Sequence, residues 1–495
     1  MPGTVMPTAV TIPADAVVLA TPEPISPANT LPPTRPLPTR AAGDTVLPTP
    51  DPPHIELESG EAGLVLSSHT ISAGQTLAFI ANYYQVDLEA LLVLNDLTAD
   101  SILQIGQVLV IPTEVDATSP PFKIIPDSEL VYGPAVQGFD VRAFSEAYGG
   151  YILQYRDEVE GRTLAGPEIV ELVALRYSVN PRLLLAALEF RTGWVSRADP
   201  PTLSEYMMGY TRPGYEGLYQ QLGWAANQMN WGYYGRREGG LSAFTLNDGT
   251  RVGFAPTVNH GTAGVQKWLG AHDTSNVEAW LIETQASGFY GTYDRLFGSP
   301  FAFAVEPILP ANLQQPPFVL PWQSGEIWYF TGGPHGGWAS GSAWASLDFA
   351  PDKDQLGCYL SPSWVTAVGP GLVVFSDMGG VLVDSDGDGN PGTGWVTVYW
   401  HVDQSERVQV GTTLQAGDRI GHPSCEGGFS NGTHLHLARR YNGHWISADG
   451  DVPFELEGWL ALGAGREYDG YLVRGEVQRE ACVCVEDEIN GILRE

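Results

Sequence analysis

Residues 67–113 carry apolar positions in an order that predicts strand, helix, helix and strand. Short runs at 69–71 and 108–111 predict the two strands, the second stopped by the proline that follows it. Between them, the segment 77–84 repeats its apolar side chains at the 3.6-residue spacing of one helical face. Asp87 then predicts the start of a second helix, because its carboxylate can cap the free backbone N–H groups of a first turn. The segment is therefore expected to form a small βααβ module.

Residues 140–300 change to the longer period of helices. Asn180 and Pro181 predict a helix start, since asparagine is a good cap and proline suits the first helical position. The run 183–188 is apolar on all sides, which predicts a buried helix. Residues 323–462 alternate apolar and polar positions or are β-branched between glycine turns, and predict a mainly antiparallel sheet. The chain is therefore expected to be a multidomain α+β protein, as its length of 495 residues also indicates.

Segments of different composition separate these units. Residues 1–66 are rich in proline, threonine and alanine and predict a disordered, extended stalk. Residues 114–139 and 301–322 are predicted to be linkers, and residues 463–495 an acidic tail.

Acidic side chains dominate the charge of the chain. With 57 Asp and Glu against 25 Lys and Arg, the net charge is −32. A nucleic acid is not expected as a partner, because neutralising its phosphates requires basic patches. No apolar run is long enough to predict a membrane span. Residues 1–20 contain neither Lys nor Arg and no continuous apolar core, so they do not have the pattern of a signal peptide.

The phrases "SAGQTL" at the first turn and "IGQVLVIP" at the end, with Asn95 between them, make residues 67–113 resemble the LysM domain. The resemblance implies binding of glycans that contain N-acetylglucosamine, peptidoglycan among them. It also implies a glycan groove between the first turn and the segment before the last strand. The implied groove residues are Gly74, Gln75, Thr76, Ile102, Leu103 and Gln104.

Histidines gather within residues 323–462, in the phrases "GGPHGGW", "VYWHVDQ" and "NGTHLHLARR", with an aspartate in "SLDFAPD". His434 and His436 are two residues apart, so on a strand their imidazoles lie on the same face. Imidazoles with one carboxylate suit zinc, and three protein ligands leave a fourth position for water. Zinc lowers the pKa of that water, and a neighbouring histidine can accept its proton. The phrases therefore predict a zinc hydrolase.

The same phrases, with "AVGPGLVV" and the hairpin "VGTTLQAGDRIG", resemble the lysostaphin-type (LytM) peptidoglycan metalloendopeptidases. The resemblance implies a β domain of the duplicated hybrid motif type that cleaves peptide bonds in peptidoglycan. Position by position, it implies the zinc ligands His335, Asp348 and His436, and the catalytic histidines His401 and His434. The chain departs from the family between the first two ligands, where residues 336–347 replace the usual three. Their Gly, Ser and Ala content predicts a surface loop.

Glu189 ends the predicted buried helix and gives residues 140–300 a limited resemblance to lysozyme-type lytic transglycosylases. In those enzymes a buried glutamate with a raised pKa protonates a glycosidic oxygen. The alternative is a structural carboxylate in an ion pair, with Arg191 as a candidate partner. The usual Glu-Ser dipeptide is absent because Phe190 follows, so a structural or glycan-binding helical domain is favoured.

The segment "VDSDGDGNPGTG" copies the first half of an EF-hand loop, with glycine at the sixth position. Trp395 stands where the bidentate glutamate of such a loop belongs. A calcium-stabilised hairpin and a plain acidic turn are both consistent with this pattern. The candidate calcium ligands are Asp384, Asp386, Asp388 and Asn390.

The four cysteines, Cys358, Cys425, Cys482 and Cys484, allow three pairings. A bond between the first two would suit a protein outside the cytoplasm. A bond between the last two would be strained, because a single residue separates them. Nearby, the two arginines at 439–440 are interpreted as a solvated pair.

Together these features predict a secreted or cell-wall-associated peptidoglycan hydrolase. Its cofactor would be Zn²⁺, with Ca²⁺ as a second candidate, and its LysM module would bring it to glycan. Two alternatives remain from the sequence. One is a non-catalytic, wall-binding regulator of other hydrolases, and the other is cleavage of glycan strands through Glu189.

Overall fold

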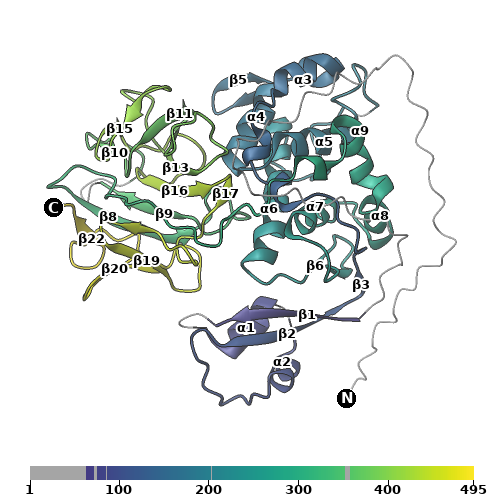
Figure 1. Ribbon diagram of the computed structural model, residues 1–495, viewed down its shortest axis with the longest axis horizontal. Coiled ribbons are helices and arrows are strands. Elements are labelled where there is room, and N and C mark those ends of the chain that lie inside the picture. The colour runs from purple at the N-terminus through teal and green to yellow at the C-terminus, as the bar shows by residue number, and fades with distance from the viewer. Residues whose placement is uncertain (1–62, 72–74, 85, 202, 352–356) are drawn as a thin grey trace.

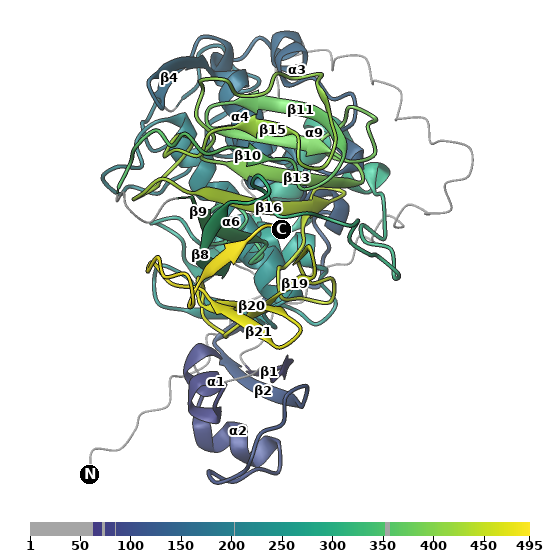
Figure 2. The same ribbon diagram turned by 90° about the vertical axis from the view of Figure 1, so that its left-hand side faces the viewer.

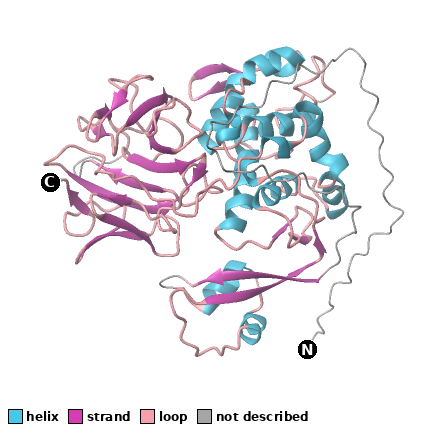
Figure 3. Ribbon diagram, viewed as in Figure 1, coloured by secondary structure: helices cyan, strands magenta, loops and turns pink. Residues whose placement is uncertain are grey.

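A computed structural model describes residues 63–71, 75–84, 86–201, 203–351 and 357–495. Strands gather on one side of the molecule and helices on the other, and a small module lies at one end (Figure 1, Figure 3). The predicted stalk falls almost entirely outside the described residues. None of the helices described is by itself long and apolar enough to cross a bilayer; a sharply bent pair, Leu77–Tyr84 with Leu88–Leu94, passes by length and composition only.

The N-terminal module has the predicted order of elements. Strands β1 (Gly63–Thr70) and β2 (Val108–Val115) pair antiparallel around α1 (Leu77–Tyr84) and α2 (Leu88–Leu94). Asp87 caps α2, its carboxylate accepting the Ala90 N–H at 2.9 Å. The prediction that Pro112 stops the last strand is wrong, since β2 continues to Val115. A sheet of two strands has only edges, where a missing N–H is tolerated.

The segment predicted to be helical, residues 140–300, contains seven of the described α-helices, which pack into a helical domain. Its helix α5 is buried from Pro181 to Glu189, and Asn180 caps it by accepting the Arg182 N–H at 2.9 Å. The two-stranded hairpin β4–β5 (Arg156–Val159 and Arg162–Ala165) projects from this domain. The helices are α3 (Val141–Tyr148), α4 (Gly166–Tyr177), α5 (Pro181–Thr192), α6 (Leu218–Arg237), α7 (His260–Leu269), α8 (Val277–Glu283) and α9 (Gly291–Phe297).

Nine of the described strands after the helical domain build a large antiparallel sheet in the order β14-β11-β12-β13-β16-β9-β8-β22, with β17 paired to β16. Some neighbours follow one another in the chain, as β11 and β12 do, whereas the pairs β13–β16, β16–β9 and β8–β22 join distant segments. Their bounds are β8 (Ile327–His335), β9 (Ser346–Ala350), β11 (Gly371–Asp377), β12 (Gly380–Asp384), β13 (Trp395–Trp400), β14 (Thr413–Leu414), β16 (Leu435–Tyr441), β17 (His444–Trp445) and β22 (Gly491–Leu493).

Residues 463–495 are part of the fold, in contrast to the predicted acidic tail. Strands β18 to β21 form a separate sheet, and β22 pairs with β8 at the edge of the large sheet (Figure 2). Their acidic residues are interleaved with apolar ones that pack, which composition alone does not reveal. The bounds in this second sheet are β18 (Glu455–Leu456), β19 (Trp459–Gly463), β20 (Gly470–Arg474) and β21 (Val477–Glu480).

The helical domain and the large sheet share one hydrophobic core. Trp400, Trp445 and Leu382 of the sheet belong to the same buried cluster as the helices. The predicted linkers are also packed, with Ile124 and Trp322 fully buried. The interpretation of the arginines at 439–440 as solvated is wrong, because the helical domain and the loop after β17 cover both side chains.

Candidate metal centre and the cleft around it

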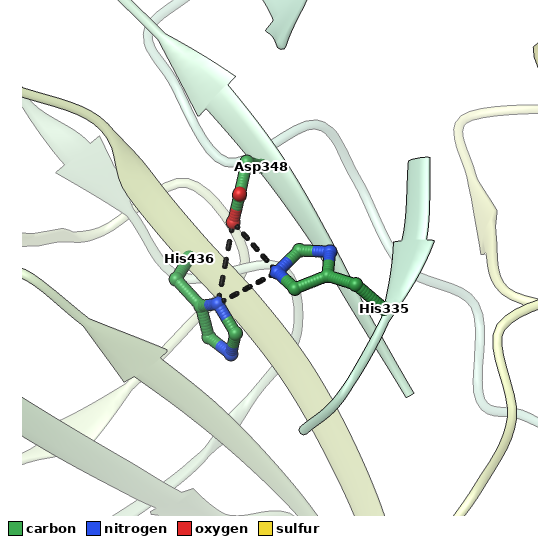
Figure 4. Close-up of side chains that lie close together, drawn as sticks. All are labelled: His335, Asp348 and His436. Carbon is green, nitrogen blue, oxygen red and sulfur yellow. Dashed lines mark hydrogen bonds and ion pairs between the residues drawn. The ribbon is translucent and has the colours of Figure 1, made fainter. Parts of the chain in front are cut away.

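Three neighbouring strands bring His335, Asp348 and His436 together. His335 ends β8, Asp348 lies in β9, and His436 lies in β16 directly opposite Asp348. Asp348 Oδ1 is 3.2 Å from His335 Nε2 and 3.2 Å from His436 Nδ1, and the two nitrogens are 3.1 Å apart (Figure 4). All three residues are at least nine-tenths buried. The set predicted from the resemblance is therefore a real cluster.

The hydrogen bonds behind the cluster decide what the three inner atoms can do. His335 Nδ1 donates to the Gly333 carbonyl at 2.8 Å, and His436 Nε2 donates to the Gly337 carbonyl at 3.1 Å. Because a carbonyl can only accept, the proton of each neutral ring lies on its outer nitrogen. The inner atoms are then two lone pairs and a buried carboxylate oxygen, Asp348 Oδ1, with no hydrogen-bond donor among the described residues. Three converging acceptors fit a cation, so the donor set suits a metal ion.

The charge of Asp348 is compatible with this arrangement. Burial alone would raise its pKa, but the neighbouring His335 and His434 outweigh burial and hold the pKa of the carboxyl well below its usual range. The carboxyl is therefore ionised at neutral pH, as a metal ligand must be.

His401 and His434 lie beside the cluster, as the resemblance implies. His401 follows β13, and its Nδ1 donates to the Glu426 carbonyl at 2.8 Å; His434 precedes β16, and its Nδ1 donates to the Gly432 carbonyl at 2.8 Å. The ring centroids are 4.5 Å apart, and His434 Nε2 is 3.7 Å from Asp348 Oδ1. Burial, reinforced by His434 and His436, lowers the pKa of His401 to about 3. His401 is therefore neutral at physiological pH, with Nε2 free to accept a proton.

The segment 336–347 is not the surface loop that its composition predicted. Most of it is buried, because it packs against the helical domain. Gly341 N donates to Asn227 Oδ1 on α6 at 2.7 Å, and Trp338 packs against Trp400 with the rings tilted and their centroids 4.6 Å apart. Since this segment supplies the Gly337 carbonyl that orients His436, the helical domain supports the cluster indirectly.

A cleft of about 650 Å³ opens at the cluster between the two domains. His335, His401 and His436 line one side, and Tyr177 and Tyr219 of the helical domain line the other. These helical-domain residues carry no catalytic motif, and nothing in the sequence indicated that they reach the site. Only the tertiary fold brings them there.

Glu189 has a different environment. Its carboxylate accepts hydrogen bonds from Val195 N at 3.1 Å, Ser196 N at 3.0 Å and Ser196 Oγ at 2.6 Å, and pairs with Arg295 at 3.1 Å. It is buried and is not among the residues that line the cleft. Arg191, the candidate partner from the sequence, pairs with Glu283 instead. These contacts describe a carboxylate that fixes the turn after α5.

The other candidate sites lie apart from the cleft. Asp384, Asp386 and Asp388 have carboxylate oxygens within 4.8 Å of one another, and Asp384 also accepts the N–H groups of Asp386 and Gly389. The nearby Asn390 accepts the N–H of a glycine with its side chain. Calcium binding by this loop stays a prediction.

The implied glycan groove is described in part. Gln75 Oε1 accepts a hydrogen bond from His69 Nε2 at 2.8 Å, and the hydroxyl of the next residue, Thr76, accepts the Phe79 N–H. Gly74 lies outside the described residues. On the other side of the implied groove, Ile102 is 90% exposed and Leu103 packs partly into the module's core. The Gln104 N–H donates a hydrogen bond to Gln107 Oε1 at 3.1 Å.

Comparison with known families now adds to the geometry. The family model "LysM domain" matches residues 69–112, "LasA, N-terminal domain" matches residues 123–312, and "Peptidase family M23" matches residues 357–448. The chain is a metallopeptidase with an M23 domain. The M23 match contains His401, His434 and His436, whereas His335 and Asp348 lie before it, and the fold places them against it.

Several known proteins are similar to parts of this chain. Protease LasA of Pseudomonas aeruginosa strain PAO1 is 26% identical over 344 residues, which covers 66% of this chain and 75% of LasA; LasA of strain UCBPP-PA14 matches equally. Among solved structures, the M23 metalloprotease pseudoalterin is 26% identical over 34% of this chain and 96% of its own, with a TM-score of 0.28. The catalytic domain of lysostaphin from Staphylococcus simulans is 21% identical over 24% of this chain and 87% of its own, with a TM-score of 0.18.

Proposed function

We propose that the chain is a zinc endopeptidase that cleaves peptide bonds in the stem or cross-bridge peptides of peptidoglycan. The observation that carries this proposal is the convergence of three acceptor atoms from His335, Asp348 and His436, each ring oriented by a backbone carbonyl. Two imidazoles and one carboxylate form a donor set suited to zinc, and three protein ligands are typical of a catalytic rather than a structural site.

A zinc ion at this position would supply a Lewis acid that polarises the scissile carbonyl and makes water more acidic. The protein's own residues then handle the protons. His401 and His434 each keep one nitrogen on a backbone carbonyl and hold the other bare beside the cluster. One of them accepts the proton of the attacking water. The other can stabilise the oxyanion at the carbonyl only when its second nitrogen is protonated, because a bare nitrogen accepts but does not donate a hydrogen bond.

The other domains support a wall substrate. A LysM module brings the enzyme to glycan, and the cleft between the M23 and helical domains holds the peptide. The disulfides Cys358–Cys425 and Cys482–Cys484 favour a location outside the cytoplasm or at the cell wall, where such bonds persist. Because the chain has a net charge of −32, attraction to the wall would depend on specific sugar contacts.

The test is digestion of purified peptidoglycan by the full chain, followed by mass spectrometry of the products. We expect new amino termini from stem or bridge peptides, lost with a zinc chelator and restored by added zinc. Intact peptides under all conditions would refute the endopeptidase. Chelator-resistant cleavage of glycan strands would instead indicate the helical domain, and Glu189→Gln would then have to abolish it. Wall binding without any product would indicate a regulator.

A further inference from the structure

The wall of the cleft that faces the metal cluster is acidic. Five of its lining residues are carboxylates, and the described lining contains no lysine or arginine. Four come from the helical domain and one from the connection between β19 and β20. They are Asp157, Glu158, Glu160, Glu216 and Glu467.

Only one of these carboxylates is neutralised by a cation. Glu160 forms a two-point ion pair with Arg176, at 2.6 and 2.8 Å. Among the residues described, Asp157, Glu158 and Glu216 form no ion pair with lysine or arginine. They accept hydrogen bonds from neutral groups instead: Tyr155 OH at 3.3 Å for Asp157, the Thr163 hydroxyl for Glu158, and Tyr206 OH at 2.6 Å for Glu216.

These neutral donors do not cancel the charge of the carboxylates. The bond from Tyr206 is the main reason that the pKa of Glu216 is lowered. At neutral pH the helical-domain wall therefore presents three negative charges to whatever enters the cleft, and Glu467 adds a fourth near the cluster. A metal ion held by two neutral rings and one carboxylate leaves a net charge of only about +1, which does not balance them.

The acidic wall is also held firmly in place. Arg176, whose side chain is fully buried, anchors the hairpin β4–β5 through Glu160 and lies 4.9 Å from the Trp338 ring and 5.4 Å from the Trp400 ring. At the same turn of the hairpin, Arg162, the first residue of β5, pairs with Asp377 of β11 at 2.6 Å. Charges on a fixed wall keep their position when a substrate binds, so they can discriminate between substrates.

We propose that Asp157, Glu158 and Glu216 are specificity residues that select peptides carrying a primary ammonium group. This inference rests on the proposed peptidase function and names the chemical class that its cleft accepts. A peptide with a free side-chain amine gains Coulomb attraction to the wall, whereas an uncharged peptide of the same length does not. The preference is therefore predicted to appear in kcat/KM at low salt and to weaken as salt is added.

The experiment compares two forms of one purified peptidoglycan whose peptides carry side-chain amines. One form is untreated, and in the other acetic anhydride has converted the ammonium groups to neutral amides. Cleavage is followed as new peptide termini by mass spectrometry. We expect the wild-type chain to cut the acetylated wall about tenfold more slowly, because acetylation removes the charge that the three carboxylates attract.

The variant Asp157→Asn/Glu158→Gln/Glu216→Gln removes the charges and keeps the acceptor oxygens. It should cut the untreated wall about tenfold more slowly than the wild-type chain does. On the acetylated wall it should match the rate of the wild-type chain on that same wall, and this equality shows that the variant is folded. The matched control Glu146→Gln/Asp199→Asn/Glu278→Gln removes three exposed charges of the same domain outside the cleft and should keep the full preference.

Four results would contradict the inference. Equal cleavage of both walls by the wild-type chain would overturn the inference, as would a tenfold preference that survives in the cleft variant. A preference lost equally in the control would assign the effect to overall charge and also overturn it. If the wild-type chain cuts neither wall, the peptidase proposal itself fails and this inference falls with it.

Discussion

The contact between Arg176 and Glu160 offers a sharp test of how the helical domain is held against the M23 domain. The Arg176 guanidinium is fully buried and donates to both oxygens of Glu160, to Tyr219 and to the Met378 carbonyl. The substitution Glu160→Gln removes the countercharge and keeps a side chain of the same size. The guanidinium then stays buried without a carboxylate.

The expected cost follows from burial. Removing one partner of a fully buried ion pair costs about 3–5 kcal/mol, because the remaining charge is uncompensated. The Glu160 side chain is 30% exposed, so water screens part of the interaction, and the glutamine oxygen still accepts one hydrogen bond. We therefore expect Glu160→Gln to lower the free energy of unfolding by about 2 kcal/mol.

The control lies on the same hairpin. Arg162 and Asp377 also join the two domains, but their side chains are 51% and 47% exposed. Arg162→Gln should therefore cost less than about 1 kcal/mol. Urea unfolding followed by tryptophan fluorescence measures both variants, with an unchanged m-value as the sign that only stability has changed. The reasoning is refuted if Glu160→Gln costs no more than Arg162→Gln.

Three further predictions concern other parts of the chain. His401→Ala and His434→Ala should each lower kcat on peptidoglycan by about 100-fold or more while metal content stays at the wild-type level; unchanged kcat in both would exclude them from proton transfer. Burial, with Arg191 adding to it, lowers the pKa of His272 to about 4, so the unfolded chain binds an extra proton below pH 6.5 and stability falls as pH drops toward 4. The full loss in the free energy of unfolding is about 3 kcal/mol. Measured by urea unfolding as a function of pH, His272→Asn should show a smaller loss over this range. A pH dependence identical to that of the wild-type chain would contradict the pKa shift. The Asn95 side chain donates to the carbonyls of Leu91 and Val110 and accepts the Val110 N–H. Asn95→Ala should therefore accelerate hydrogen exchange of the Val110 amide by about tenfold. An unchanged exchange rate would show that the side-chain bridge does not protect this amide.

The sequence predicted features that depend on nearby residues. Asp87 and Asn180 mark helix starts because a cap needs only the next two or three backbone N–H groups. The pair His434 and His436 shares a face because strand geometry alone sets that spacing. The resemblance then joined these residues to His335 and Asp348. The strand order β16-β9-β8 brings His335, Asp348 and His436 into one cluster, with His434 beside it.

Features that depend on distant segments were missed. The segment 336–347 is polar and small in composition, yet α6 covers it, and no local pattern shows this. Arg440 looks exposed in sequence but donates to the Leu175 carbonyl and to Ser178 across the domain interface. The acidic wall of the cleft was missed for the same reason, since four of its five carboxylates lie in the helical domain, which carries no motif for the chemistry.

The most direct test of the metal centre is a count of zinc bound to the full chain. Metal-depleted protein is loaded with zinc, passed through a desalting column and analysed by elemental mass spectrometry. The account predicts one tightly held zinc ion per chain, absent from His335→Ala and His436→Ala. The control His422→Ala should keep it, because His422 contacts the Ser363 carbonyl and Glu406, away from the cluster. Zinc retained at the wild-type level by the first two variants, or no zinc held by the wild-type chain, would contradict the account.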